Sequence, residues 1–204
     1  MNEYDPVEGM LSGERGYSIL EVVVVVGLIG VISAIAVPMF GNAIATFRLS
    51  GDARSVSNAM ALTKMRAAGN FTRVRLFVDL NGKTHRIESW DKVASTWTIE
   101  GGTTQLSQGV SFSYGIVAAA PPSTQTTIGQ SSKCTTDLGV QIANTACVMF
   151  NSRGVPVDAS FAPTGADALY LTDGAAVYGV TVAATGMVKM WRTLPRVVPV
   201  WVRS

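Results

Sequence analysis

The stretch "RGYSILEVVVVVGLIGVISAIAVP", residues 15–38, decides how this chain is organised. From Ser18 to Val37 it offers twenty residues, which as a helix would span about 30 Å, the hydrocarbon thickness of a bilayer. Its five consecutive valines favour a strand in water, but in lipid every backbone amide needs a partner within the segment. We therefore expect a membrane-spanning helix with one acid, Glu21, at its edge.

Length and charge fit a membrane segment followed by one extracytoplasmic domain. The 204 residues allow one ordinary domain plus an extension, and the charged share of 15% is low against a typical value of about 25%. The formal net charge of +2 hides an asymmetry, because residues 1–16 hold four acids and one base while the remainder holds 15 bases and 10 acids. This mild basic excess is not the strong one expected of a dedicated nucleic-acid binder.

The apolar run has two ordinary interpretations. As a secretory signal peptide it would use Ala34-Ile35-Ala36 as its cleavage site, but the region before the run is acidic rather than basic and Glu21 lies where the core should be uncharged. As a single-pass anchor it would place Glu21 at the lipid surface. The second interpretation stays open.

Four residues stand in one register around the run. Counted from Tyr17, which follows Gly16, Glu21 is the fifth residue and Pro38 the twenty-second. In this register the stretch closely resembles the type III signal of type IV pilins and pseudopilins. The resemblance implies that a prepilin peptidase cuts between Gly16 and Tyr17 on the cytoplasmic side and methylates the new amine of Tyr17. It also implies that Glu21 meets the N-terminal amine of a neighbouring subunit as helices enter a filament core, with Pro38 a further assembly residue.

The segment before the cut departs from the usual pattern. Leaders of this family are usually short and basic, whereas residues 1–16 carry four acids. A start at Met10 would give the shorter leader "MLSGERG", in which Arg15 balances Glu14. Both starts remain open.

The helix is expected to continue past Pro38. Proline lacks the amide proton of an uninterrupted helix, so we expect a kink or local melting there, and Gly69-Asn70 supplies the stop after about Ala68. Helical spacing places one set of apolar residues on a face that would cover a sheet: Leu49, Ala53, Val56, Met60 and Ala67.

Beyond the helix the hydrophobic period changes to two. Val74 to Leu80 alternates as a half-buried strand, and Asn81-Gly82 supplies a hairpin turn into Thr84 to Lys92. Further predicted strands are 95–100, 110–114, 146–151, 168–171, 177–183 and 187–192. The span 115–136 is expected to be a long mobile loop. The fold class is therefore α+β, with a long N-terminal helix packed on a C-terminal antiparallel β domain, as in pilins.

The predicted organisation has four parts: 1–16 leader peptide, 17–38 transmembrane and filament-core helix, 39–69 amphipathic continuation of the helix, and 70–204 periplasmic β-rich domain. Three distal segments look like the strand pattern of the GspH/FimT group of minor pilins and pseudopilins: "LSQGVSF" (106–112), "CVMFNSRGVPVD" (147–158) and "VYGVTVAATGMVKMW" (177–191).

Cys134 and Cys147 are thirteen positions apart without a CxxC motif or a Cys/His cluster, which disfavours metal binding. Outside the cytoplasm a disulfide between them could contribute about 3 kcal/mol. Two unpaired buried thiols are the alternative.

Catalytic chemistry has little support in the residues. His85, the single histidine, lies on a predicted strand without a nucleophile elbow, and Gly101-Gly102 reads as a turn. The loop acids Asp137, Asp158, Asp167 and Asp173 do not follow a calcium-loop spacing. We expect no enzyme activity, no metal and no cofactor.

Nucleic-acid contact is a weaker hypothesis for Lys189, Trp191 and Arg192, where bases adjoin an aromatic ring near the C-terminus. Some FimT-like pilins bind DNA through a Gly-Arg-x-Arg motif. The nearest match here, Gly186 to Lys189, lacks the arginine after the glycine, and a solvated strand edge explains the bases equally well.

The sequence thus predicts a minor pilin or pseudopilin that is held in the bacterial inner membrane by a single span, with its β domain in the periplasm. After cleavage it would join other pilins in a type II secretion pseudopilus or a type IV pilus. Its partners would be the prepilin peptidase, sister pilins and, before assembly, membrane lipid. The alternatives are a DNA-binding pilin for natural transformation and an unrelated single-pass anchored protein.

Overall fold

The computed structural model describes residues 16–204, apart from the side chains of Val37–Met39 and Asn42. The chain divides into two compact units after Asn42, so that the second unit is Ala43–Ser204. The leader proposed from the sequence lies outside the described residues, except for Gly16.

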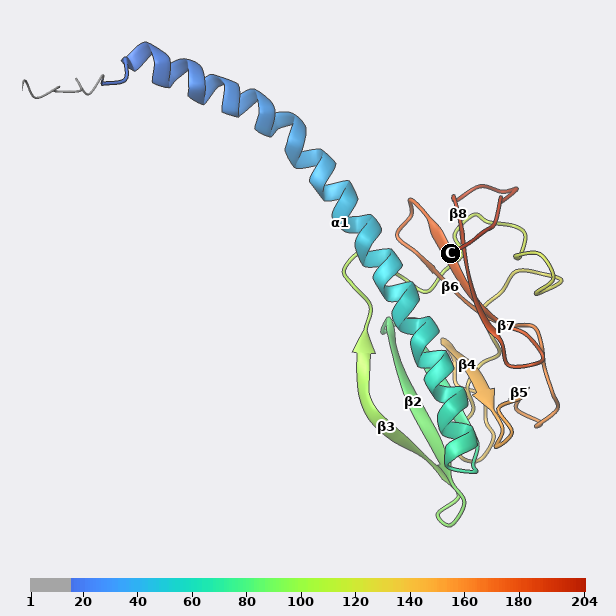
Figure 1. Ribbon diagram of the computed structural model, residues 1–204. Coiled ribbons are helices and arrows are strands. Elements are labelled where there is room, and N and C mark those ends of the chain that lie inside the picture. Colours follow the sequence, from blue (N-terminus) through green and yellow to red (C-terminus); the bar gives the residue numbers. More distant parts are fainter. Residues whose placement is uncertain (1–15) are drawn as a thin grey trace, which may run out of the picture. The chain divides into compact units, whose positions relative to one another are not determined.

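One helix, α1 (Ile19–Gly69), contributes to both units (Figure 1). Its helical assignment passes through Pro38 without interruption, so the predicted continuation is confirmed and local melting is not seen. The helix ends where Asn70 N still donates to Arg66 O at 2.8 Å, one residue beyond the predicted end.

The second part of α1 carries the predicted apolar face. Five of its residues are at most 1% exposed, and all five match the helical spacing in the sequence: Leu49, Ala53, Val56, Met60 and Ala67. Thr63 shares the buried face and satisfies its hydroxyl by donating to Ala59 O at 2.7 Å. This face packs against both sheets of the β domain.

The first sheet, sheet A, is antiparallel and has the strand order β3-β2-β1-β4-β5. Its strands are β1 (Val74–Asp79), β2 (Thr84–Asp91), β3 (Thr96–Gln105), β4 (Thr145–Phe150) and β5 (Pro156–Val157). Asp79 pairs with Thr84, so the β1–β2 hairpin has a four-residue loop, in which Asp79 Oδ1 accepts from Gly82 N at 2.8 Å.

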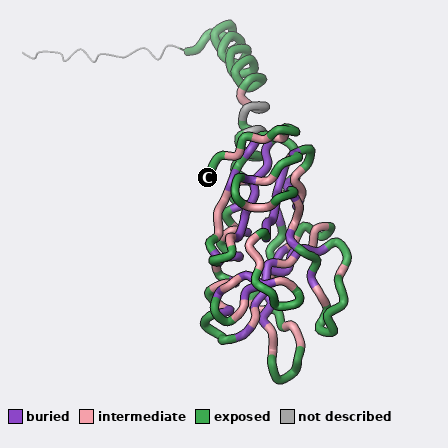
Figure 2. The backbone as a smooth tube through the Cα atoms, turned by 90° about the vertical axis from the view of Figure 1, so that its right-hand side faces the viewer, coloured by how far each residue is buried: buried purple, intermediate pink, exposed green. Residues whose placement is uncertain are grey.

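The second sheet, sheet B, follows sequence order: β6 (Asp167–Thr172), β7 (Val177–Val182), β8 (Val188–Thr193) and β9 (Val202–Arg203). One face of sheet B joins the α1 face and sheet A in the main core. Its other face is covered by a second cluster in which Tyr170, Val117 and Ile128 are buried and Trp201 is partly buried. Figure 2 shows burial concentrated in the second unit, while the first part of α1 is exposed.

The structure is therefore α+β, with a long N-terminal helix and antiparallel sheets, as predicted. Seven of the eight predicted strands are present within a few residues of their expected ends. The predicted strand at 110–114 is wrong: its apolar alternation reflects burial of Val110 and Phe112, and the segment contributes only an isolated bridge from Ser111 to Thr172. The short strands β5 and β9 were not predicted.

The segment 115–136 forms no helix or strand, as expected of a loop. It nevertheless packs onto sheet B through Val117 and Ile128. Gln130 reinforces this packing by donating to Tyr170 O and accepting from Tyr170 N, both at 2.9 Å. The Gln130 side chain thus bonds both backbone groups of Tyr170, as a neighbouring strand would. Together with the buried Val117 and Ile128, these bonds make the segment part of the folded domain.

Candidate functional site

The entrance to α1 is the first candidate site. Gly16, Tyr17 and Ser18 precede the helix and are exposed, with Tyr17 82% accessible. Ser18 caps the helix, because its Oγ accepts from Leu20 N at 3.3 Å and its carbonyl accepts from Val22 N at 3.2 Å. The Gly16–Tyr17 peptide bond therefore lies just outside the helix.

Glu21 lies in the first turn of α1 and is exposed. The N-terminal turn of a helix carries partial positive charge, so a carboxylate is favoured there over any position deeper in the apolar run. Glu21 is four positions after Tyr17, with Ser18, Ile19 and Leu20 between them, and it is the third residue of α1.

The apolar run presents its whole surface to the surroundings. The residues Ile19–Ala36 have a mean hydropathy of 2.7 and none of them is buried. From Ile19 to Ile35 the large apolar side chains are 48% to 84% exposed. This is the one helix in the described part of the chain that is long and apolar enough to cross a membrane. Such a surface needs lipid or other apolar helices as its environment. The side chain of Pro38, the other proposed assembly residue, lies outside the described residues.

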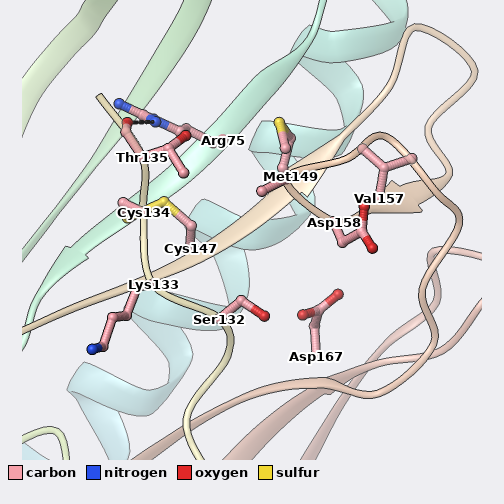
Figure 3. Close-up of a pocket in the computed structure, with 11 residues that line it drawn as sticks. Arg75, Ser132, Lys133, Cys134, Thr135, Cys147, Met149, Val157, Asp158 and Asp167 are labelled. Carbon is pink, nitrogen blue, oxygen red and sulfur yellow. Dashed lines mark hydrogen bonds between the residues drawn. A yellow bond between two sulfur atoms is a disulfide. The ribbon is translucent and has the colours of Figure 1, made fainter. Parts of the chain in front are cut away.

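Cys134 and Cys147 form a disulfide in the structure, with their Cα atoms 4.9 Å apart (Figure 3). The bond attaches the segment before β4 to β4 itself. Two hydrogen bonds run alongside it, from Cys147 N to Ser132 O at 2.8 Å and from Cys134 N to Thr145 Oγ1 at 3.0 Å. The disulfide thus fastens this segment over one face of sheet A.

Beneath that segment lies an ionic cluster that the sequence did not reveal. Glu88 accepts from Arg75 Nε and from Arg86 Nε, both at 2.7 Å, and Arg75 and Glu88 are each about 95% buried. Burial lowers the pKa of Arg75, while Glu88 raises it. Arg75 also donates to Thr135 O at 2.7 Å, so the segment carrying Cys134 covers the cluster. Strand alternation alone predicts solvent for Arg75, because the covering segment comes from sixty residues away.

Asp167 is a buried acid at the start of β6, 9% exposed. Figure 3 shows its carboxylate directed toward the space between Ser132 and Asp158, next to a cavity of about 20 Å³. Burial raises the pKa of Asp167 to about 6, against the opposing effect of the Thr164 and Ser131 hydroxyls. One oxygen, Oδ2, has no hydrogen-bond partner among the described residues.

The residues considered for catalysis and metal binding are engaged in burial, a disulfide or hydrogen bonds to the backbone. His85 is 3% exposed on β2, and burial lowers its pKa against the opposing charge of Asp52. Both cysteines are in the disulfide, so neither forms a Cys/His pair. Asp158 and Asp173 accept backbone N–H groups in their own turns, and Asp137 accepts from Trp97 N of β3 at 2.9 Å. Within residues 16–204 no three acids, histidines or cysteines gather as a metal site.

The three residues proposed for nucleic-acid contact do not form one surface. Lys189 and Trp191 lie on one face of β8 and Arg192 on the other, because alternate strand residues point to opposite faces. Trp191 is 9% exposed and donates its Nε1–H to Thr181 Oγ1 at 3.0 Å, so its ring is not available for base stacking.

Comparison with known proteins gives a limited result. No protein-family model matches the chain, and no curated protein matches it. Two solved structures of the minor pseudopilin EpsH from the type 2 secretion system of Vibrio cholerae are similar to it, both with a TM-score of 0.43. One is 11% identical over 70% of this chain and 95% of that chain, and the other is 12% identical over 76% and 96%. Likeness at this level does not assign the chain to a family.

Proposed function

We propose that this chain is a minor pilin or pseudopilin, a non-enzymatic subunit that is held in the inner membrane and then joins a filament. The observation that carries the proposal is the register at the start of α1. An exposed Gly16-Tyr17 bond, an acid in the first turn and a fully exposed apolar run follow one another without a gap. In a subunit that moves from lipid into a helical bundle, the bond would be cut, the acid would pair with a neighbouring subunit and the apolar run would lie first in lipid and then among sister helices.

The exposed bond is the proposed processing site. A prepilin peptidase would cut between Gly16 and Tyr17 and methylate the amine of Tyr17, leaving the apolar run on the mature chain. The Ser18 cap supports this, because it starts the helix after the scissile bond and keeps that bond outside the helix.

Glu21 is the proposed assembly residue. A lone carboxylate among apolar side chains costs a few kcal/mol in lipid, so it favours any arrangement that supplies a cation. The amine of Tyr17 on a neighbouring subunit would supply one after cleavage. Pairing of this kind sets the register of the helices more than it adds net stability.

The β domain would lie in the periplasm and present side surfaces to a few partner pilins. The disulfide supports an oxidising compartment, since such bonds persist outside the cytoplasm. The machine that the filament serves would be a type II secretion pseudopilus or a type IV pilus.

N-terminal sequencing of the membrane-extracted protein, from cells with and without a prepilin peptidase, tests the processing step. The expected result is a chain that begins at methylated Tyr17 only when the peptidase is present. Gly16→Val should block the cut, while Gly13→Val, a matched change at another glycine of the same segment, should leave it intact. An uncleaved chain, or a new N-terminus at Val37, would refute the proposal.

Replacing Glu21 tests the assembly step. Glu21→Ala should leave cleavage unchanged and lower the amount of subunit recovered in sheared filaments. Ser33→Ala removes a different polar group from the same apolar run and is the control. Equal recovery of the Glu21→Ala variant and the wild type would show that the acid has another purpose.

A further inference from the structure

The end of sheet B and the residues after it form a surface that is both basic and apolar, here called the C-terminal surface (Arg192–Ser204). Five of its apolar side chains are 47% to 80% exposed: Leu194, Val197, Val198, Val200 and Val202. Arg192, Arg196 and Arg203 line a hollow of about 550 Å³ together with Leu194 and Val200. No aspartate or glutamate lies between Arg192 and Ser204 in the chain.

Within residues 16–204 the three guanidinium groups form no ion pair. In the described part of the chain, ion pairs are made by Arg66, Arg75 and Arg86, and none involves the C-terminal surface. Two of the three lie near aromatic rings instead, with Arg203 5.6 Å from the Trp191 ring centre and Arg192 6.0 Å from that of Tyr178. Ring contacts leave the N–H groups of an arginine able to bind an anion.

This surface lies at the end of the second unit where the chain enters from the apolar helix. The opposite end is marked by Lys64, whose Nζ donates to Gly186 O at 3.0 Å in the β7–β8 turn. From there β8 runs about 20 Å to Thr193, and α1 runs back a similar distance from Lys64 to Leu49. In Figure 1 the C-terminus accordingly lies at the end of the second unit that holds the first helical turns after Ala43.

Chain connectivity limits the distance between the apolar span and the start of the second unit. The apolar span ends at Ala36 and the second unit begins at Ala43. Seven helical residues measure about 10 Å, so the first residues of the second unit follow the apolar span within about 10 Å along the chain.

We propose that the C-terminal surface docks on anionic phospholipid, with phosphate groups at Arg196 and Arg203 and the valines at the boundary of the acyl chains. Arg192 points to the opposite face of sheet B from Trp191 and Arg203 and is not one of these phosphate ligands. The inference rests on the proposed residence of α1 in the membrane. Arginines surrounding an apolar patch match an anionic lipid surface, where each basic residue strengthens binding about fivefold. Docking would hold the subunit at the membrane until filament entry replaces lipid with sister subunits.

Nucleic acid fits the same surface less well. Single-stranded DNA needs exposed aromatic rings for its bases, whereas the exposed apolar side chains here are aliphatic. Trp191 is buried, and Trp201 is held by its hydrogen bond to Ala119 O at 2.9 Å and by Tyr170, 6.0 Å away between ring centres.

The test uses the full chain in vesicles of phosphatidylcholine, with and without about one third phosphatidylglycerol. A fluorophore is attached to the cysteine introduced by Val198→Cys, and lipids with a nitroxide at headgroup level quench it when the surface docks. Strong quenching is expected only with phosphatidylglycerol. Adding Arg196→Gln and Arg203→Gln should lower the ratio of docked to undocked molecules about 30-fold, because each of the two removed basic residues contributes about fivefold.

The matched control, Lys92→Gln with Arg153→Gln, removes the same charge elsewhere on the β domain and should quench like the parent. Inorganic phosphate, compared with sodium chloride at equal ionic strength, should not reverse the quenching. Reversal by phosphate would identify a free-anion site and overturn the lipid proposal. Equal quenching in both lipid mixtures, or quenching unaffected by the arginine changes, would also overturn it.

A second fluorophore at Leu28→Cys separates this inference from the proposed function. Quenching by acyl-chain nitroxides at Leu28 without quenching at Val198 refutes docking alone. Loss of quenching at Leu28 refutes the membrane residence of α1, on which the proposed function depends.

Discussion

Asp167→Asn should stabilise the β domain at neutral pH, because it removes a charge that the fold buries. The carboxylate is 9% exposed, and its Oδ2 has no hydrogen-bond partner among the described residues. Burial raises its pKa from the ordinary 3.8 to about 6. Asparagine keeps the shape of the side chain without the charge.

The size and the pH window follow from proton linkage. A pKa raised in the folded state means that the folded protein binds the proton more tightly than the unfolded chain. The resulting stability is fully present below the unfolded value of 3.8 and is lost as the pH rises through about 6. The interval between the two values corresponds to about 3 kcal/mol. Above neutrality the wild type lacks this contribution, whereas the neutral asparagine never depends on it.

Urea unfolding of residues 43–204, followed by tryptophan fluorescence, measures the effect, since every residue of both buried clusters lies within this fragment. The variant should be more stable than the wild type by about 2 to 3 kcal/mol at pH 8 and by under about 0.5 kcal/mol near pH 3.5. Asp173→Asn is the control: the asparagine oxygen can still accept from Ala175 N and Ala176 N, so stability should change by under about 0.5 kcal/mol at both values. An equal gain at both pH values, or a loss at pH 8, would show that burial of the charge is not the cause.

Two further changes test what holds the β domain together. Glu88→Gln should lower the free energy of unfolding of the same fragment by about 3 to 5 kcal/mol, since it leaves the buried Arg75 without its partner. Glu100→Gln breaks a pair with the one-third exposed Arg66 and should cost under about 1 kcal/mol, so similar losses would contradict the role of burial. Replacing both Cys134 and Cys147 by serine should cost about 3 kcal/mol, and reduction of the wild type should reproduce that loss. No change on reduction would mean that the bond adds nothing to stability.

The local features could be predicted from the sequence because each depends on neighbours along the chain. The helical spacing of Leu49, Ala53, Val56, Met60 and Ala67 determines which face of α1 is buried, whatever covers it. The period-two alternation from Val74 and the apolar run before Pro38 are equally local signals. So is the register of Gly16, Tyr17 and Glu21, which carries the proposed function.

Tertiary structure decided the features that depend on segments far apart in the chain. In the sequence Arg75 looks like an exposed strand residue and Asp167 like a loop acid. In the fold Thr135 and its neighbours cover Arg75, and the region of Ser132 and Asp158 lies against Asp167. The segment 110–114 alternates like a strand but finds no partner beyond one bridge, because pairing requires a free edge as well as a pattern. The C-terminal surface likewise exists only in the fold, since only there do residues of β8, of β9 and of the loop between them line one hollow. The sequence specifies which apolar face each segment can bury. Only the packing of distant segments against one another decides which charged side chains are covered as well.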